Sequence, residues 1–249
     1  MSVLSLNDIS RSFGELQALQ GINLEVAPHE LRAVIGPNGA GKTTLFNLVS
    51  GAFPPSSGEV IFNGNNINGL SPERRVHAGI VRTFQITEVF LDLPVFENVQ
   101  VAVETAMGLN RWPFIGRARR QTVRDKVSEL MEATQLTGKE DRVVGELAHG
   151  DQRVVEVAVA LALAPKLLLL DEPTAGMGDR ETEHMVRLIR HLHDERGIPM
   201  LFIEHDMSLV FDVADRITVL DNGRFLAEGT PKEVAANDDV QAAYLGGSA

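Results

Sequence analysis

A glycine-rich segment at residues 36–43 carries residue types that bind phosphate groups. It matches the pattern G-x-x-x-x-G-K-[ST] in full, between an apolar strand pattern at residues 31–35 and a helical pattern. Glycines let backbone N–H groups approach phosphate oxygens, and the positive end of the following helix faces the same anion. Lys42 is expected to reach the β- and γ-phosphates of a nucleotide, and the Thr43 hydroxyl to ligate Mg²⁺. The predicted nucleotide-binding residues here are Gly36, Pro37, Asn38, Gly39, Ala40, Gly41, Lys42, Thr43 and Thr44.

Two carboxylates end a later apolar strand pattern. Four leucines at residues 167–170 lead into Asp171 and Glu172. Ligands of α/β proteins lie at the carboxyl ends of the strands, so Asp171 is expected to hold Mg²⁺ through a water. Glu172 is then placed to polarise an attacking water as a general base. Such a pair alone would indicate solvated acids, but the phosphate-binding pattern in the same chain favours catalysis.

A histidine follows another strand pattern. Residues 200–203 are apolar, and Glu204, His205 and Asp206 come directly after them. A lone histidine is more often structural than catalytic. Because His205 ends a strand in the same way as the Asp-Glu pair, we expect it to contact the γ-phosphate.

The elements that must position these residues form three groups along the chain. Short strand patterns with turns occupy the first sixty residues. Helical periodicities follow at residues 99–107, 123–131 and 152–164, and strands alternate with helices in the last third. That alternation predicts an α/β fold with a mainly parallel sheet. We interpret residues 93–165 as a helical insertion in a single domain, 1–249, whose core is 1–92 and 166–249.

Composition excludes several classes of protein. The 249 residues include no cysteine, which rules out a disulfide framework, a thiolate zinc site and a cysteine nucleophile. The net charge of −11 argues against a protein that coats nucleic acid. The longest apolar stretch, residues 157–170, is interrupted by Pro165 and Lys166, and the N-terminus lacks the features of a secretory signal. We therefore expect neither a membrane span nor export.

The order and spacing of these motifs resemble the ATP-binding subunit of an ABC transporter, from Leu4 to about Leu245. The resemblance implies a P-loop NTPase core, an N-terminal antiparallel β-subdomain, an inserted α-helical subdomain, and ATP and Mg²⁺ as cofactors. It also implies that Phe13 stacks on adenine and that His205 is the family's switch histidine. Gln85, in Arg-Thr-Phe-Gln, matches the residue that senses the γ-phosphate, binds the metal and contacts the membrane subunit.

Residues 147–152, Leu-Ala-His-Gly-Asp-Gln, fall where the family signature, usually Leu-Ser-Gly-Gly-Gln, should lie. In the family, two subunits pack head to tail, and this segment closes over the ATP of the other subunit, which assigns Ala148, His149 and Gly150 to the nucleotide. The segment precedes an apolar helix, so its amides and the helix dipole favour an anion. From the segment alone, an ordinary capped helix start is the simpler interpretation.

The chain departs from the family pattern in the signature and in the loop that crosses the dimer interface. Ala148 lacks the usual hydroxyl, Asp151 brings an acid near the triphosphate, and Gly178 replaces an aspartate. A bulky residue before the signature glycine, the long stretch between Gln85 and Leu147, and the ending at residues 240–246 resemble subunits of branched-chain amino-acid importers. Urea and amide uptake systems share these features.

The resemblance also implies partners and a location. The partners are a second ATPase subunit, identical or different, integral membrane permease subunits, and a periplasmic or extracellular solute-binding protein, with no nucleic acid. The location is the cytoplasmic face of the cell membrane. The apolar segment at residues 86–99 is expected to form the groove that receives a membrane-subunit helix. A basic cluster indicates a solvated helix face or, alternatively, contact with lipid head groups or a membrane subunit; it consists of Arg111, Arg117, Arg119, Arg120 and Arg124.

Three rival functions stay open at this point. A soluble ABC ATPase acting on nucleic acid or ribosomes fits poorly with the acidic charge and the absence of basic arms. A nearly inactive nucleotide-binding partner is suggested by the altered signature and Gly178. A P-loop kinase would need a pocket for its acceptor substrate and a lid that carries arginines. The basic cluster resembles such a lid.

Overall fold

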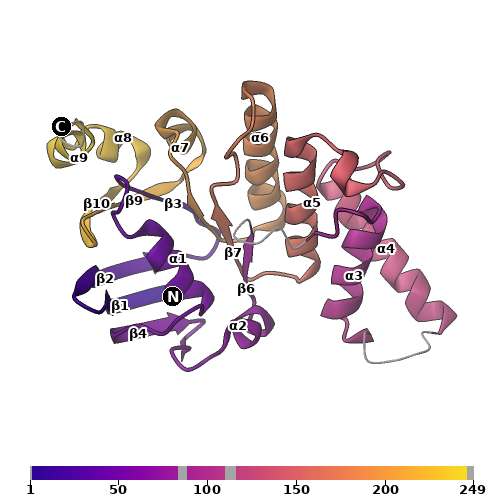
Figure 1. The fold of residues 1–249 in the computed structure, drawn as a ribbon, viewed down its shortest axis with the longest axis horizontal. Helices are drawn as coiled ribbons and strands as arrows, with labels where there is room; N and C mark the ends of the chain where they lie inside the picture. Colours follow the sequence, from indigo (N-terminus) through magenta and orange to yellow (C-terminus); the bar gives the residue numbers. More distant parts are fainter. Residues whose placement is uncertain (1, 84–88, 110–115, 246–249) are drawn as a thin grey trace.

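The structure is a computed structural model that describes residues 2–83, 89–109 and 116–245 (Figure 1). Its centre is a six-stranded sheet in the order β10-β9-β3-β8-β7-β6. The strands are β3 (Leu31–Ile35), β6 (Ile80–Thr83), β7 (Leu167–Asp171), β8 (Met200–Ile203), β9 (Arg216–Asp221) and β10 (Arg224–Gly229). Neighbouring strands are parallel, except for the antiparallel pair β9 and β10. The predicted α/β fold with a mainly parallel sheet is confirmed.

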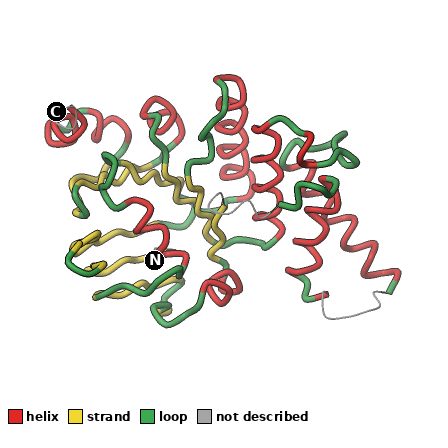
Figure 2. The backbone as a smooth tube through the Cα atoms, viewed as in Figure 1, coloured by secondary structure: helices red, strands yellow, loops and turns green. Residues whose placement is uncertain are grey.

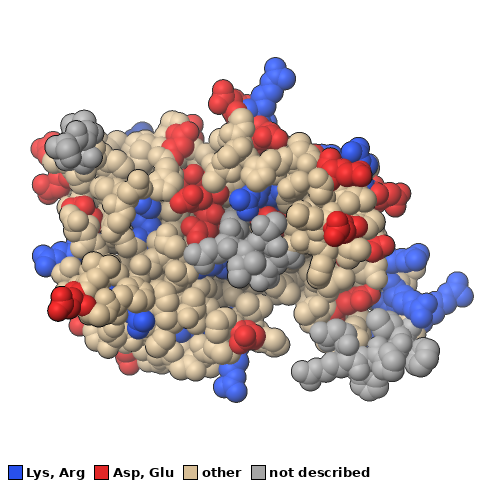
Figure 3. All heavy atoms as spheres, in the orientation of Figure 1, with Lys and Arg blue, Asp and Glu red and all other residues tan. Residues whose placement is uncertain are grey.

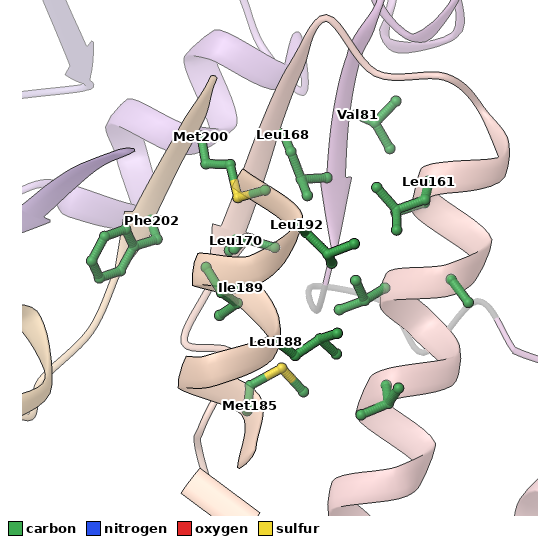
Figure 4. Packing of buried hydrophobic residues seen from close by; sticks show 14 of the residues in the cluster. Val81, Leu161, Leu168, Leu170, Met185, Leu188, Ile189, Leu192, Met200 and Phe202 are labelled. Atoms are coloured by element: carbon green, nitrogen blue, oxygen red, sulfur yellow. The ribbon is translucent and has the colours of Figure 1, made fainter. Parts of the chain in front are cut away.

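The central strands are buried on both faces. Every residue of β3 and β8 is buried, as are the leucines of β7. Successive side chains of a strand point to opposite faces, so β7 contributes to two clusters. Leu168 and Leu170 pack against helices α5 and α6 (Figure 4), whereas Leu167 and Leu169 face α1 and a second sheet. Because β3, β8 and β7 are parallel, their carboxyl ends lie at the same edge of the sheet. The polar residues that follow these strands in the sequence therefore lie at that edge too.

The second sheet is antiparallel and formed by the N-terminal part of the chain. It has the order β2-β1-β4-β5. The strands are β1 (Leu4–Phe13), β2 (Leu16–Val26), β4 (Ser57–Phe62) and β5 (Asn65–Asn66). Its apolar face packs on helix α1 and on the central sheet, with Leu6, Ile22 and Val60 in the shared cluster. This sheet agrees with the N-terminal antiparallel β-subdomain that the resemblance implied.

Helices cover the two sheets and extend the molecule to one side. They are α1 (Lys42–Ser50), α2 (Pro72–Ala78), α3 (Val95–Ala106), α4 (Arg117–Ala133), α5 (His149–Ala162), α6 (Asp179–Arg196), α7 (Met207–Val213), α8 (Pro231–Ala235) and α9 (Asp238–Leu245). Figure 2 shows that α3, α4 and α5 gather on the right of the view, beside the strands. Val99, Val127 and Leu161 join these helices in one apolar cluster with the central sheet. The boundaries 93–165 of the helical insertion stay a prediction.

Two details bear on the sequence predictions. Helix α5 begins at His149, before the predicted start at Gln152, because the Gln152 amide already donates to the Ala148 carbonyl at 3.0 Å. The apolar periodicity missed this first turn because its residues are polar or small. Among the described residues, no helix has the length and apolar character needed to cross a bilayer.

Candidate nucleotide-binding site

The loop between β3 and α1 is shaped by glycines at positions that exclude a side chain. Gly36 has φ 150°, and a Cβ there would lie 2.1 Å from the Leu220 carbonyl oxygen. Gly41 caps α1 at φ 98°, where a Cβ would lie 2.8 Å from the Ala18 carbonyl oxygen. In the described part of the chain, no side chain caps the start of α1. The positive end of the helix is therefore available to an anion.

Lys42 is folded back over this loop. Its Nζ donates to the carbonyl oxygens of Gly36 at 2.6 Å and Pro37 at 3.0 Å, and the residue is 6% exposed. Burial lowers the pKa of the Lys42 ammonium, and the charge of Glu172 opposes that shift. A phosphate group offers stronger acceptors than these carbonyls, so an incoming nucleotide competes directly for the ammonium.

A cavity of about 440 Å³ joins the loop to the ends of β7 and β8. Glu172 and His205 line it together with Lys42 and Thr43. The remaining lining residues come from the start of β2, the phosphate loop and the start of α1, and the turn between β9 and β10: Leu16, Gln17, Ala18, Asn38, Gly39, Ala40, Gly41, Thr44, Asn222 and Gly223. The fold thus brings together the phosphate loop, Glu172 and His205, which are up to 169 positions apart in the sequence.

Glu172 and His205 are hydrogen-bonded to each other. His205 Nε2 donates to Glu172 Oε1 at 2.8 Å, and both side chains are about half exposed. Glu172 has φ 51°, a left-handed conformation that is unusual for a residue with a side chain. Its amide donates to the Ile203 carbonyl at 3.0 Å, which ties the end of β7 to β8. The pair presents a carboxylate to the cavity with its orientation set by the imidazole.

Asp171 lies one residue before Glu172 but faces a different partner. Its Oδ2 forms an ion pair with Arg82 of β6, and both side chains are about nine-tenths buried. Arg82 Nη1 also donates to Asn47 Oδ1 of α1 at 2.6 Å. Asp171 is not among the residues that line the cavity in the described part of the chain. Hydroxyl and carboxylate oxygens are the donors that Mg²⁺ takes in proteins, so Thr43 and Asp171 have the right chemistry for this ion, but the Asp171 carboxylate would have to turn from Arg82 toward the cavity to bind it.

The adenine-stacking residue assigned by resemblance, Phe13, lies outside the cavity. Its ring packs edge-on against Phe53, with centroids 5.3 Å apart, and Arg11 lies over both rings at 4.6 and 4.7 Å. Phe13 is nevertheless 43% exposed. Leu16, three residues later in the same hairpin, lines the cavity instead. The role of Phe13 therefore stays a prediction.

The signature residues are grouped at the start of α5, around a separate cavity of about 310 Å³. Ala148 caps the helix, and His149 Nε2 lies 3.3 Å from the Ala175 carbonyl oxygen. The Gly150 amide donates to Glu181 Oε1 of α6 at 3.3 Å. Among the described residues, no residue lines both this cavity and that of the phosphate loop. The chain therefore does not bring its own signature to its own phosphate loop.

The departures from the family pattern have local partners. Asp151 forms an ion pair with Lys139 at 2.7 Å, so this acid meets a cation. Gly178 caps α6, and Asp179 is the first residue of that helix. Four arginines of the basic cluster, 117, 119, 120 and 124, lie exposed in the first turns of α4, and Figure 3 shows basic side chains at that end of the molecule. Gln85 and Arg111 lie outside the described residues.

Three residues of the site were missed by sequence reasoning. Arg82 pairs with Asp171, Glu204 accepts hydrogen bonds beside His205, and Glu181 contacts Gly150. The position of Glu204 directly after the strand was a usable signal. Arg82 and Glu181 carried none, because their partners lie 89 and 31 residues away in the chain.

Comparisons with known proteins agree with this geometry. Residues 19–175 match the family model "ABC transporter", and residues 226–249 match "Branched-chain amino acid ATP-binding cassette transporter". The high-affinity branched-chain amino acid transport ATP-binding proteins LivG of Escherichia coli and BraF of Pseudomonas aeruginosa are 39% and 38% identical, each over 98% of this chain and 98% of the relative.

The fold has counterparts among solved structures. The ATP-binding cassette MJ1267 of an ABC transporter superposes with a TM-score of 0.85 and 30% identity, over 98% of this chain and 99% of the other. The family model alone covers more than half of the chain. The protein therefore belongs to the ABC transporter family, as one of its ATP-binding cassette ATPases.

Proposed function

We propose that this chain is the ATP-hydrolysing subunit of an importer that takes up branched-chain amino acids. The Glu172–His205 pair, which lines the phosphate-loop cavity, carries the hydrolytic part of the proposal. The solute is supported by the names of LivG and BraF and by the match at residues 226–249. Identity over the core alone does not discriminate solutes, since the sulfate/thiosulfate import protein CysA of Bradyrhizobium diazoefficiens is 36% identical over 93% of this chain.

Hydrolysis follows from the arrangement of the chain's own groups. The triphosphate lies on the amides of the loop and the start of α1, and Lys42 turns from the Gly36 and Pro37 carbonyls to the β- and γ-phosphates. Thr43 and Asp171 would hold Mg²⁺, which supplies charge neutralisation at the phosphates. Glu172 then accepts a proton from a water whose oxygen attacks the γ-phosphorus, while the bond to the bridging oxygen of ADP breaks. His205 keeps the Glu172 carboxylate turned toward the cavity.

The signature and the phosphate loop line separate cavities, which supports a second ATPase chain as partner. The start of α5 in that second chain would supply the charge stabilisation at the γ-phosphate that this chain's own α5 does not supply there. The pull-down of the tagged chain distinguishes an identical second ATPase from a different one. We further propose ATP with Mg²⁺ as the working substrate form, and the cytoplasmic face of the cell membrane as the location. A solute-binding protein would complete the system.

A groove of about 260 Å³ between α2, β6 and α5 is the proposed seat of a permease helix. Its walls are mainly apolar and include Val76, Val81, Val89 and Val159. Val89 falls in the segment that the sequence analysis assigned to this groove, whereas residues 86–88 lie outside the described residues. An amphipathic helix that lays its apolar face in such a groove is a recurrent docking mode.

The test is uptake by the native host after deletion of this gene. Restoring the wild-type chain is expected to restore uptake of labelled leucine, isoleucine and valine, whereas restoring Glu172→Gln is not, although that variant still binds ATP. Urea and sulfate uptake, measured in the same cells, should not change. Loss of urea uptake in place of leucine uptake would move the solute to the urea and amide class.

A gentle-detergent pull-down from native membranes tests the partners. Membrane permease subunits, a second ATPase and a solute-binding protein are expected to accompany the tagged chain. Ribosomal or nucleic-acid partners without a membrane protein would contradict the importer. An assembled transporter whose turnover is unchanged by Glu172→Gln would identify this chain as a structural nucleotide-binding partner.

A further inference from the structure

Glu204 places a buried carboxylate between the turn that follows Glu172 and the backbone of His205. The residue follows β8 and is 5% exposed. Its Oε1 accepts from the Thr174 amide at 2.9 Å and from the Thr174 hydroxyl at 2.7 Å. Its Oε2 accepts from the His205 amide at 3.2 Å. One side chain therefore connects the turn that follows Glu172 to the backbone of His205.

The Glu172 backbone needs such a connection. A residue with a side chain persists in the left-handed region only when its surroundings hold it there. On the N-terminal side, the Glu172 amide donates to Ile203 at 3.0 Å. On the C-terminal side, the Ala175 amide donates to the Glu172 carbonyl at 3.1 Å, and Glu204 holds Thr174 within that turn. Glu204 thus closes the turn that aims the Glu172 carboxylate at His205.

The choice of a carboxylate is explained by its partners. All three groups that face Glu204 are hydrogen-bond donors, and an ionised carboxylate only accepts. A glutamine of the same size would turn an NH₂ group toward at least one donor and leave that contact unmade. Bonds to an ionised group are also shorter and stronger than neutral ones.

We propose that Glu204 is a positioning residue for ATP hydrolysis, which holds Glu172 and His205 at their 2.8 Å contact without touching the nucleotide. This inference rests on the proposed role of Glu172 as the general base. Because Glu204 is not among the described residues that line the phosphate-loop cavity, its loss acts on turnover rather than on ATP affinity.

The main test uses Glu204→Gln in the transporter purified with its partners. Its kcat for ATP is expected to fall about ten- to a hundredfold, the usual effect of misplacing a catalytic group, whereas ATP affinity stays within about twofold of wild type. The matched control is Glu30→Gln, another buried acid, which accepts from the Ala27 amide at 2.7 Å, pairs with Arg32, and lies at the opposite end of β3 from the phosphate loop. This control is expected to change the melting temperature but not kcat. Equal kcat in wild type and Glu204→Gln would overturn the proposal.

A second pair of variants keeps the test decisive if Glu204→Gln folds poorly. Thr174→Val removes the hydroxyl donor to Glu204 and is expected to lower kcat about threefold or more. Thr174→Ser keeps that donor and is expected to restore kcat. If both variants behave alike, the link from Thr174 to Glu204 does not position the base.

A double mutant separates this inference from the function on which it rests. When Glu172→Gln is already present, adding Glu204→Gln is expected to cause no further loss in single-turnover hydrolysis, because residues that act as a unit are not additive. A further loss of the same size as in the wild-type background would show independent roles. If Glu172→Gln alone leaves turnover unchanged, the proposed base is wrong, whatever Glu204 does.

Discussion

The starts of α1 and α5 are both suited to binding a phosphate group, but the groups that the chain places at the two starts differ. At α1, Gly41 is the cap, the first turn contains no acid, and the Lys42 ammonium lies over the loop. At α5, Ala148 is the cap, and the Gly150 amide already donates to the Glu181 carboxylate at 3.3 Å. Both helices offer the same positive dipole end. Only the first is left open to an external anion.

This difference supports the proposal that one chain supplies half of a nucleotide site. The phosphate-loop half has its cation, its glycines and its catalytic pair around one cavity. In the signature half, the Glu181 carboxylate occupies the helix start, so under the proposed function a phosphate bound by another chain would have to displace Glu181 to reach the Gly150 amide. Under the proposed function, we therefore expect ATP binding to be a property of the single chain and hydrolysis to depend on closure against a partner.

The largest effect is expected from Lys42→Ala. This change removes the ammonium from the open half of the site, and charge-assisted bonds to two phosphates are lost together. ATP affinity of the isolated chain should fall by at least about a hundredfold, as measured by calorimetric titration. Lys139→Ala, which removes the partner of Asp151 in the other half, serves as the control and should leave this affinity unchanged. Affinity within about threefold of wild type would contradict the assignment of Lys42.

Gly150→Ala is expected to act only on the signature half of the site. A Cβ at Gly150 would lie 3.0 Å from Glu181 Oε1 and 3.1 Å from Glu181 Cβ, so a methyl group crowds the helix start that must receive the phosphate. Turnover of the assembled transporter should fall about tenfold, the cost of roughly one lost hydrogen bond to a charged group. ATP affinity of the isolated chain should not change.

The control for that experiment is Gly116→Ala, at the start of α4, where an added Cβ meets no described residue within 4 Å. It should leave turnover unchanged. If Gly150→Ala hydrolyses ATP as fast as this control, the α5 start does not contact the phosphate.

Alkaline pH is a finer test of the phosphate-loop half of the site. Burial lowers the pKa of Lys42, with Glu172 opposing the shift, so the ammonium loses its proton at a lower pH than an exposed lysine does. ATP binds best to the protonated form, so affinity is constant below this lowered pKa and falls as pH rises through it. We expect the ATP affinity of the isolated chain to begin declining at a pH below the ordinary lysine pKa of 10.5. Lys42→Arg, which stays charged, should give a flat profile, and a parallel decline in both would exclude Lys42 as the titrating group.

The smallest effect is expected from Glu181→Gln. The neutral amide keeps the size of the side chain but loses the attraction of a carboxylate for a helix N-terminus, about 0.3–1 kcal/mol. Turnover of the assembled transporter should therefore rise about two- to fivefold, with ATP affinity of the isolated chain unchanged. A decrease in turnover would show that Glu181 supports closure rather than competing with the phosphate.

Much of the architecture could be predicted from local patterns. The apolar strands at residues 31–35, 167–170 and 200–203 were placed correctly, because strands buried on both faces leave a continuous apolar run. The start of α5 was placed too late, because its first turn carries no apolar residue to continue the period. Phe13 was assigned by resemblance, but its ring packs with Phe53 and Arg11, which no spacing in the chain reveals.

The chemistry of the site followed from residue types alone: a loop of glycines before Lys42, an acid pair after a buried strand, and a histidine after the next one. Such motifs are local, so the residues that determine the required backbone conformation lie within a few positions of one another. Tertiary structure decided the partners of these residues. Arg82 neutralises Asp171, Glu204 joins the turn after Glu172 to His205, and Glu181 occupies the Gly150 amide. Hydrogen bonds and ion pairs need atoms within a few ångströms, and only the packing of the sheet and its helices determines which distant residues come that close.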